Sequence, residues 1–113
     1  MAKGTINKIF LLGRVGAEPE EKKGVVLFSL ATNSGYKDKE DQWVDKTDWH
    51  AIVAYGKKAD FCKTYVKKGS LVHIEGKITY YISEKDDGTK STRTSIAIGE
   101  ITLISTGKPG IED

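Results

Sequence analysis

Aromatic side chains close to lysines are the residues of this sequence with the clearest chemical use. Trp49 and Tyr55 are six residues apart in a run of strand-forming residues. Both would therefore face one side of a strand, about 20 Å apart at roughly 3.3 Å per residue. Rings at such a spacing can stack on separate nucleobases, while nearby lysines neutralise phosphates. The pattern alone equally allows both rings to be buried in a core or an interface.

Four further aromatic residues differ in how clearly their positions can be predicted. Tyr36 and Trp43 lie in a charged stretch without apolar periodicity, where Tyr36 is expected to be exposed and functional. Trp43 either shares that role or caps a hairpin, and the pattern does not choose between the two. Tyr80 and Tyr81 are neighbours on an expected strand and so point to opposite faces. Because Tyr80 continues an apolar stripe that starts at Val72, we expect Tyr80 to be buried and Tyr81 to be exposed.

The motifs of common enzymes and metal sites are missing. The sequence contains neither a P-loop ending in Lys-Ser/Thr nor a Gly-x-Ser-x-Gly motif. Asp48 and His50 would share a strand face without an evident nucleophile, and His50 is expected to pack in the fold or at an interface. With two histidines and one cysteine, a tetrahedral zinc site within one chain would need carboxylates. We therefore expect no catalytic residue, no metal and no cofactor, and we expect Cys62 to lie in a helix core.

Composition limits the class of protein. The 113 residues suffice for one domain, and no apolar run approaches the roughly 18 residues of a membrane span. The N-terminus lacks a secretory h-region, and a single cysteine cannot form an intrachain disulfide, so a cytoplasmic location is expected. The net charge is only +2, although residues 57–68 carry five lysines against one aspartate. The simplest interpretation of these lysines is the solvated face of a helix. Because the net charge is so small, any nucleic-acid binding must use a localised surface.

The order of the expected elements defines a fold class. Strands are predicted over residues 5–15, 25–32, 47–55, 71–82 and 90–104, a helix over 57–68, and a long loop or protruding hairpin over 36–46. Gly69 is expected to stop the helix, and a bulge near Gly99 would explain a change of apolar parity in the last strand. Three strands, a short helix and two strands match an all-β, five-stranded Greek-key OB-fold barrel. We assign residues 1–105 to this domain and 106–113 to a short flexible tail.

Several segments, in this order, resemble the bacterial and phage single-stranded DNA-binding proteins, a family of homotetrameric OB folds. They are NKIFLLGRVG at 7–16, PE at 19–20, FSLAT at 28–32, TDWH at 47–50, AYGK at 54–57, KGS at 68–70 and IEG at 74–76. The resemblance implies sequence-independent binding and protection of single-stranded DNA in replication, recombination or repair, without catalysis. It implies base stacking on Tyr36, Trp49 and Tyr55, a subunit-interface position for His50, and phosphate contacts from Lys8, Lys37, Lys57 and Lys77. A homotetramer is expected, with a dimer as the alternative.

Three positions depart from the family pattern. Ser83 stands where the family often has another tryptophan, and Tyr81, two residues earlier on the same face, is expected to replace that platform. Ala51 stands where an arginine is common, which removes one phosphate contact. The family's long tail with an acidic, phenylalanine-containing tip corresponds here only to residues 107–113, so recruitment of replication or recombination proteins through it is an open question.

Two other functions remain open from the sequence alone. The chain also resembles small dimeric primosomal relatives of the same family, OB-fold modules that mainly dock replication proteins. Such a module need not place Trp49 and Tyr55 outward, and its partner binding would survive their removal. An RNA-binding OB domain is the third possibility, because nothing in the sequence reveals a contact to a 2′-hydroxyl group.

Overall fold

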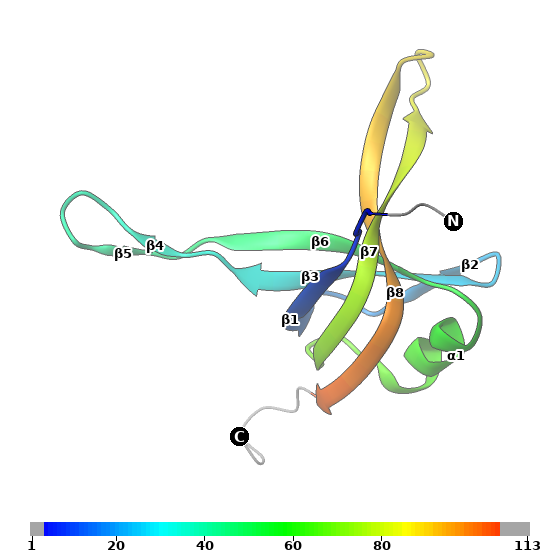
Figure 1. The fold of residues 1–113 in the computed structure, drawn as a ribbon, viewed down its shortest axis with the longest axis horizontal. Helices are drawn as coiled ribbons and strands as arrows, with labels where there is room; N and C mark the ends of the chain where they lie inside the picture. The colour runs from blue at the N-terminus through cyan, green and yellow to red at the C-terminus, as the bar shows by residue number, and fades with distance from the viewer. Residues whose placement is uncertain (1–3, 107–113) are drawn as a thin grey trace.

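The structure is a computed structural model that describes residues 4–106. Its elements, in chain order, are β1 (Ile9–Val15), β2 (Glu20–Lys22), β3 (Val25–Asn33), β4 (Tyr36–Lys37), β5 (Trp43–Val44), β6 (Thr47–Ala54), α1 (Gly56–Tyr65), β7 (Leu71–Glu84) and β8 (Lys90–Ser105). Figure 1 shows a strongly curved sheet with the helix at one end and two long hairpins that project from it. The predicted tail begins at Thr106 and otherwise lies outside the described residues.

Five long strands close into a barrel. The main sheet has the order β1-β7-β8-β6-β3-β2, and β1 closes it by pairing with β3 as well as with β7. All pairs in the barrel are antiparallel except β6 with β8, which run parallel at Ile52 and Ile96. This arrangement confirms the predicted all-β barrel with one short helix. Residues 20–22, between the first two predicted strands, form a further short strand that pairs with the edge of β3.

The core follows from the alternation of apolar side chains along the strands. In β3, Val26, Phe28 and Leu30 point inward while the residues between them are at least partly exposed. Helix α1 covers the end of the barrel with Ala59 and Cys62, which confirms the predicted core position of Cys62. The largest fully buried apolar side chains are Val26, Leu30, Ile52, Cys62, Val66, Val72 and Ile74.

The helix ends earlier than predicted. Val66 is already extended, with φ −89° and ψ 126°, and its N–H donates to the carbonyl of Cys62. Val66 still lies on the buried side that carries Ala59 and Cys62, but from there the chain turns through residues 67–70 to enter β7 at Leu71. Gly69, expected to stop the helix, instead takes its positive φ of +88° in the following turn, where the Ser70 hydroxyl accepts a hydrogen bond from the Lys67 N–H.

The buried position of Cys62 predicts a thiol that does not react in the folded protein. Burial raises its pKa to about 11, because the thiolate loses its hydration there. At pH 8 only about 0.1% of such a thiol is ionised, and the side chain has no exposed surface. We expect Ellman's reagent to leave the folded protein unmodified at pH 8 and to titrate one thiol per chain in denaturant. Rapid reaction of the folded protein would contradict the burial.

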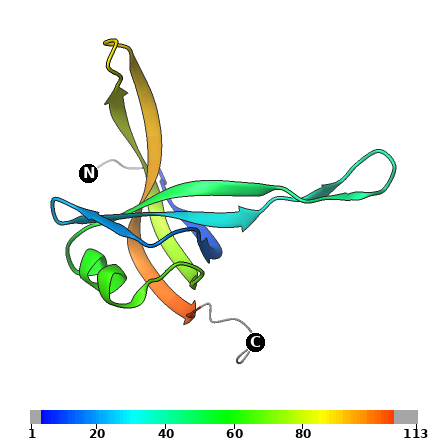
Figure 2. The same cartoon turned by 180° about the vertical axis from the view of Figure 1, so that it is seen from behind.

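Two hairpins extend beyond the barrel, as Figures 1 and 2 both show. One continues β3 and β6 through β4 and β5, which confirms the predicted protruding hairpin; we call residues 34–46 the β4–β5 arm. The other is the β7–β8 hairpin, with a turn at residues 85–89. The predicted bulge is also confirmed: Glu75 pairs with Glu100 and Gly76 pairs with Ile98, which leaves Gly99 unpaired between them.

The prediction that Tyr80 is buried is wrong. Tyr80 is 69% exposed and Tyr81 is 50% exposed. The two rings do belong to opposite faces of β7, but at this point the hairpin has passed the end of the barrel. Ile78 is the last residue of its stripe that is partly buried, and beyond it the same face has no core to pack against. The alternation of the strand was predicted correctly, and the extent of the core was not.

Candidate nucleic-acid interface

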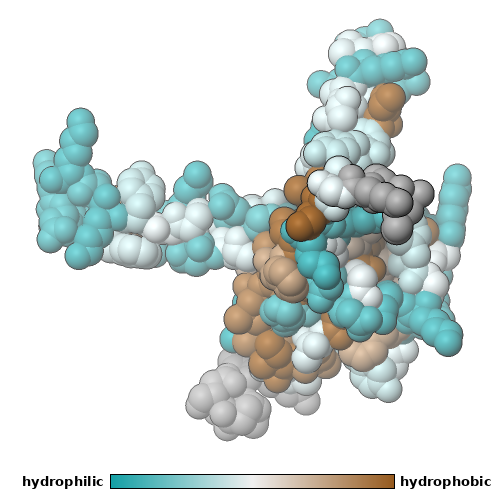
Figure 3. All heavy atoms as spheres, viewed as in Figure 1, coloured by the Kyte–Doolittle hydropathy of each residue, from teal (hydrophilic) through white to brown (hydrophobic). Residues whose placement is uncertain are grey.

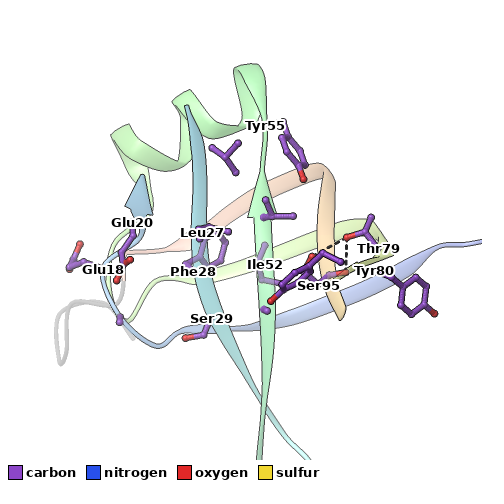
Figure 4. Close-up of a pocket in the computed structure, with 15 residues that line it drawn as sticks. Glu18, Glu20, Leu27, Phe28, Ser29, Ile52, Tyr55, Thr79, Tyr80 and Ser95 are labelled. Carbon is purple, nitrogen blue, oxygen red and sulfur yellow. Dashed lines mark hydrogen bonds between the residues drawn. The ribbon is translucent and has the colours of Figure 1, made fainter. Parts of the chain in front are cut away.

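An apolar groove crosses β3, β6 and the base of the β7–β8 hairpin (Figure 4). It has a volume of about 650 Å³. Leu27, Phe28 and Val53 contribute aliphatic and aromatic surface to it, and Thr79 and Ser95 add hydroxyl groups that hydrogen-bond to each other at 2.9 Å. Tyr55, Tyr80 and Tyr81 also line it, and Glu18 and Glu20 stand at the side formed by the segment before β3. A groove with this lining favours flat apolar groups over phosphates.

Trp49, on β6, lies beside this groove, and Tyr55, directly after β6, lies within it. Trp49 is 61% exposed and Tyr55 is 56% exposed. Trp49 belongs to β6, and Tyr55 follows its last residue, Ala54, in an extended conformation, so by alternation both lie on the side that also carries Ala51, a groove residue. Tyr55 lines the groove itself. Trp49, two residues before Ala51, is not one of the residues that line it. The two rings therefore flank one apolar surface and are not core residues.

Gly16 determines where the Trp49 ring can lie. A Cβ atom built on Gly16 would come within 2.4 Å of the Trp49 ring and within 3.1 Å of the Ser29 hydroxyl. Contacts this short do not occur between real side chains, so the ring depends on the absence of a side chain at position 16. This contact joins the end of β1 to the middle of β6, far apart in the sequence, and the sequence pattern could not reveal it.

We expect Gly16→Ala to weaken single-stranded DNA binding about threefold to tenfold, because the added methyl group displaces the Trp49 ring from its position. The affinity is measured by fluorescence anisotropy of a labelled oligonucleotide. In a Trp49→Ala background the same change should have little further effect, because the ring that it displaces is gone. Additive losses from the two changes would show that Gly16 acts independently of Trp49.

The β4–β5 arm carries the other predicted aromatic pair, away from the groove. Tyr36 pairs with Val44 and Trp43 pairs with Lys37, so the two rings lie on opposite faces of the arm. Trp43 Nε1 donates to Asp45 Oδ1 at 2.6 Å, and its ring lies against the backbone of Gly35. Both rings are nevertheless more than half exposed. The two interpretations of Trp43 are therefore compatible, because the ring packs against the arm and is still more than half exposed to solvent.

The predicted lysines fall into separate groups. Lys8 and Lys77 line a second hollow of about 550 Å³ that shares Tyr55 and Thr79 with the groove. Within it, Lys8 Nζ lies 2.8 Å from Glu75 Oε2, so this charge is already paired. Lys57 follows Tyr55 closely at the start of α1 and is exposed. Lys37 lies on the β4–β5 arm and contacts Asp41 at 3.6 Å, so the fold does not bring the four lysines into one patch.

His50 lies on β6 next to β3 and is held there by a hydrogen bond. His50 is half-buried on β6, and its Nε2 atom lies 2.8 Å from the Thr32 hydroxyl. Within residues 4–106, no three histidine, cysteine or carboxylate side chains lie close enough to hold a metal ion. In the same part of the chain, no helix is both long and apolar enough to cross a membrane.

Sequence reasoning missed an apolar surface on the outside of the barrel. Phe10, Leu12 and Ile104 are each more than half exposed there, and the Phe10 ring stacks on His73 at a centroid distance of 6.3 Å. We call these four residues the outer apolar patch. Figure 3 shows apolar side chains gathered over the barrel near β1, while the β4–β5 arm is hydrophilic. The signal was present in the sequence, because residues 9–12 are all apolar and a strand with two apolar faces has partners on both.

A closed five-stranded barrel with an aromatic-lined groove and long projecting hairpins defines an OB fold. The chain belongs to the single-strand binding protein family, whose model matches residues 6–104. The resemblance stated from the sequence is thereby confirmed. The family consists of non-enzymatic binding proteins, in agreement with the missing enzyme motifs.

Individual relatives support this assignment. The chain is 38% identical to "Single-stranded DNA-binding protein 1" of Chlorobaculum tepidum, over 97% of this chain and 71% of that protein. It is 37% identical to the mitochondrial single-stranded DNA-binding protein of Drosophila melanogaster, over 86% of this chain and 70% of the relative. Among solved structures, it is similar to a Plasmodium falciparum SSB in complex with single-stranded DNA. That match has a TM-score of 0.82 and 32% identity, and it covers 93% of this chain and 100% of the other.

Proposed function

We propose that this chain binds and protects single-stranded DNA, without sequence preference, during DNA replication, recombination or repair. The observation that carries the proposal is the exposure of Trp49, on β6, and Tyr55, directly after β6, beside and within an apolar groove. Every base has a π-face, so such a surface accepts any sequence. The similar P. falciparum structure, a complex with single-stranded DNA, supports the same ligand class.

In this mechanism, bases stack on Trp49, Tyr55 and Tyr81 while the backbone passes the lysines. Tyr81 lines the groove on the face of β7 that also carries Thr79. Lys57 and Lys77 supply positive charge near Tyr55, and Lys8 joins them when a phosphate displaces the Glu75 carboxylate. Tyr36, Trp43 and Lys37 extend the binding surface along the β4–β5 arm. A net charge of +2 gives little attraction by itself, so stacking supplies most of the affinity.

Assembly into a homotetramer, with a homodimer as the alternative, is the second part of the proposal. The outer apolar patch supports it, because large exposed apolar surfaces mark interaction sites. His50, half-buried and bonded to Thr32, is proposed to lie at a contact between subunits. Several binding faces on one particle raise the effective concentration of each for a long strand. Sedimentation velocity distinguishes four copies from two.

The proposed setting is the cytoplasm of a bacterial cell, where the chain would act beside replication or recombination proteins. A phage-encoded protein that acts in the cytoplasm of its bacterial host is equally consistent with this proposal. The relatives named above include both a bacterial and a mitochondrial protein, so single-strand binding proteins of this family serve more than one compartment.

Tryptophan fluorescence tests the proposed function directly. In a Trp43→Phe variant the only remaining tryptophan is Trp49, because the chain has two. We expect unstructured single-stranded DNA to quench this signal strongly, and added salt to weaken the binding. Duplex DNA should quench little. An equal response to RNA would widen the ligand class, and no quenching or binding would favour a protein-docking module instead. A Trp49→Phe variant, which reports on Trp43, shows whether the β4–β5 arm also contacts the strand.

A further inference from the structure

We propose that Tyr80 forms a stacking site for an additional nucleobase on the second face of the β7–β8 hairpin. A bound single strand would then cross the hairpin and contact it on both faces, with Tyr81 on one and Tyr80 on the other. This inference rests on the proposed function and adds a site that neither the sequence pattern nor the family resemblance predicted.

The ring of Tyr80 is free to accept a ligand. It is the most exposed tyrosine of the described chain, and no hydrogen bond or ring contact joins it to another described residue. Its partner across the hairpin is Thr94, a small side chain that leaves the face of the ring open. A tyrosine without a structural partner is not needed for the packing of the hairpin, so replacing it should leave the fold intact.

Tyr80 is part of a larger apolar strip. Ile82 follows on the same face, two residues further along β7, and is also 69% exposed. The residues opposite these two side chains are Thr94 and Thr92, so this face of the hairpin carries no charge between positions 80 and 82. The opposite face is different, because Tyr81 pairs there with Arg93. An uncharged strip ending in an aromatic ring is suited to a base, whereas the Arg93 side is suited to a phosphate as well.

Continuity with the groove argues for a nucleobase as the occupant of this strip. Tyr80 lines the edge of the groove that Tyr55 and Tyr81 also line. In Figure 4 it stands at the outer side of the groove, and its ring points away from Phe28 and Ile52. The hairpin is a single two-stranded layer, so a strand that leaves Tyr81 reaches Tyr80 by passing over one edge of it. One extended ligand can therefore contact both rings.

A length series of oligothymidylates tests the proposal. A base stacked on an aromatic ring changes affinity by about 5- to 150-fold on alanine substitution, and an edge site belongs at the lower end. We expect Tyr80→Ala to bind short oligonucleotides as the wild type does, and to bind longer ones about fivefold more weakly. Tyr80→Phe should restore the affinity, because it keeps the ring, and Tyr80→Leu should not. Tyr65→Ala, which removes an exposed tyrosine on α1, is the matched control.

Photo-crosslinking gives a second readout. Oligonucleotides with 5-iodouracil in place of thymine should form a crosslink to Tyr80, located by mass spectrometry of the peptides. Wild-type affinity of Tyr80→Ala at every length would overturn the inference. A sedimentation coefficient of Tyr80→Ala that differs from the wild type without DNA would also overturn it, because the strip would then be a contact between protein chains. If Trp49→Ala weakens binding and Tyr80→Ala does not, only this inference fails. If the wild-type protein binds no single-stranded DNA, the proposed function fails with it.

Discussion

Replacing Trp49 and Tyr55 together by alanine is expected to lower the affinity for single-stranded DNA at least about 30-fold. Each ring stacked on a base contributes about 1–3 kcal/mol, and the two rings lie far enough apart to stack on separate bases. The loss should persist at high salt, because stacking does not depend on counterion release, whereas the contribution of the lysines falls as salt rises. Fluorescence anisotropy of a labelled oligonucleotide at two salt concentrations measures both effects.

The matched control for this prediction is Tyr65→Ala. Tyr65 is 55% exposed, almost the same as Tyr55, but lies on α1 beside Phe61 and away from the groove. Its removal should leave the affinity within about twofold of the wild type. A double variant of Trp49 and Tyr55 that binds as tightly as the control would disprove base stacking on this face, and would make the docking of a protein the better explanation of the exposed rings.

Truncation of Ile74 to alanine should produce the largest change in folding stability. This side chain has no exposed surface, and β7 places it between β1 and β8, where it contacts the centre of the core. Removing three carbon atoms from such a site costs about 2–5 kcal/mol, through lost burial and the cavity that remains. Urea unfolding followed by circular dichroism, at equal protein concentration for all variants, measures the change in the free energy of unfolding.

Ile82→Ala is the control for this truncation, because it removes the same atoms from a side chain that is 69% exposed. Its effect on the free energy of unfolding should stay within about 0.5 kcal/mol. Equal losses from both variants would mean that the hairpin is packed against another part of the assembly. In that case the unfolding midpoint of the wild type should rise with protein concentration.

The sequence revealed the elements well where a local repeat carries the information. The apolar run at residues 25–32 was correctly predicted as a strand, and a parity change alone located the bulge at Gly99. The helix boundary failed, because the chain leaves the helix after Tyr65 to reach β7 through the turn that contains Gly69, and the position of β7 is set by its pairing with β1, far away in the chain. Periodicity likewise could not show that β7 extends past the end of the barrel at Tyr80, because the apolar alternation continues where the core has ended.

The candidate site was also predicted only in part from the sequence. The common face of Trp49 and Tyr55 follows from their spacing, but exposure of the rings does not, and before the structure it was equally consistent with burial. The Gly16 contact with the Trp49 ring and the apolar floor at Leu27 come from pairings between distant segments. Single residue types on isolated strands carry no signal for such contacts. The separation of Lys37, on the β4–β5 arm, from the lysines near Tyr55 was hidden for the same reason.

The pairing of β1 has a consequence for how the protein is made. β1 is synthesised first, yet its main partner is β7, from Gly76 opposite Ile9 to Leu71 opposite Arg14. The parallel contact of β6 with β8 near Ala97 is needed as well before the barrel is complete. Closing such long loops is entropically costly and slow. During translation, residues 9–13 of β1 therefore have no strand partner until most of the domain has emerged, and their apolar side chains are exposed to chaperones and to aggregation for that time.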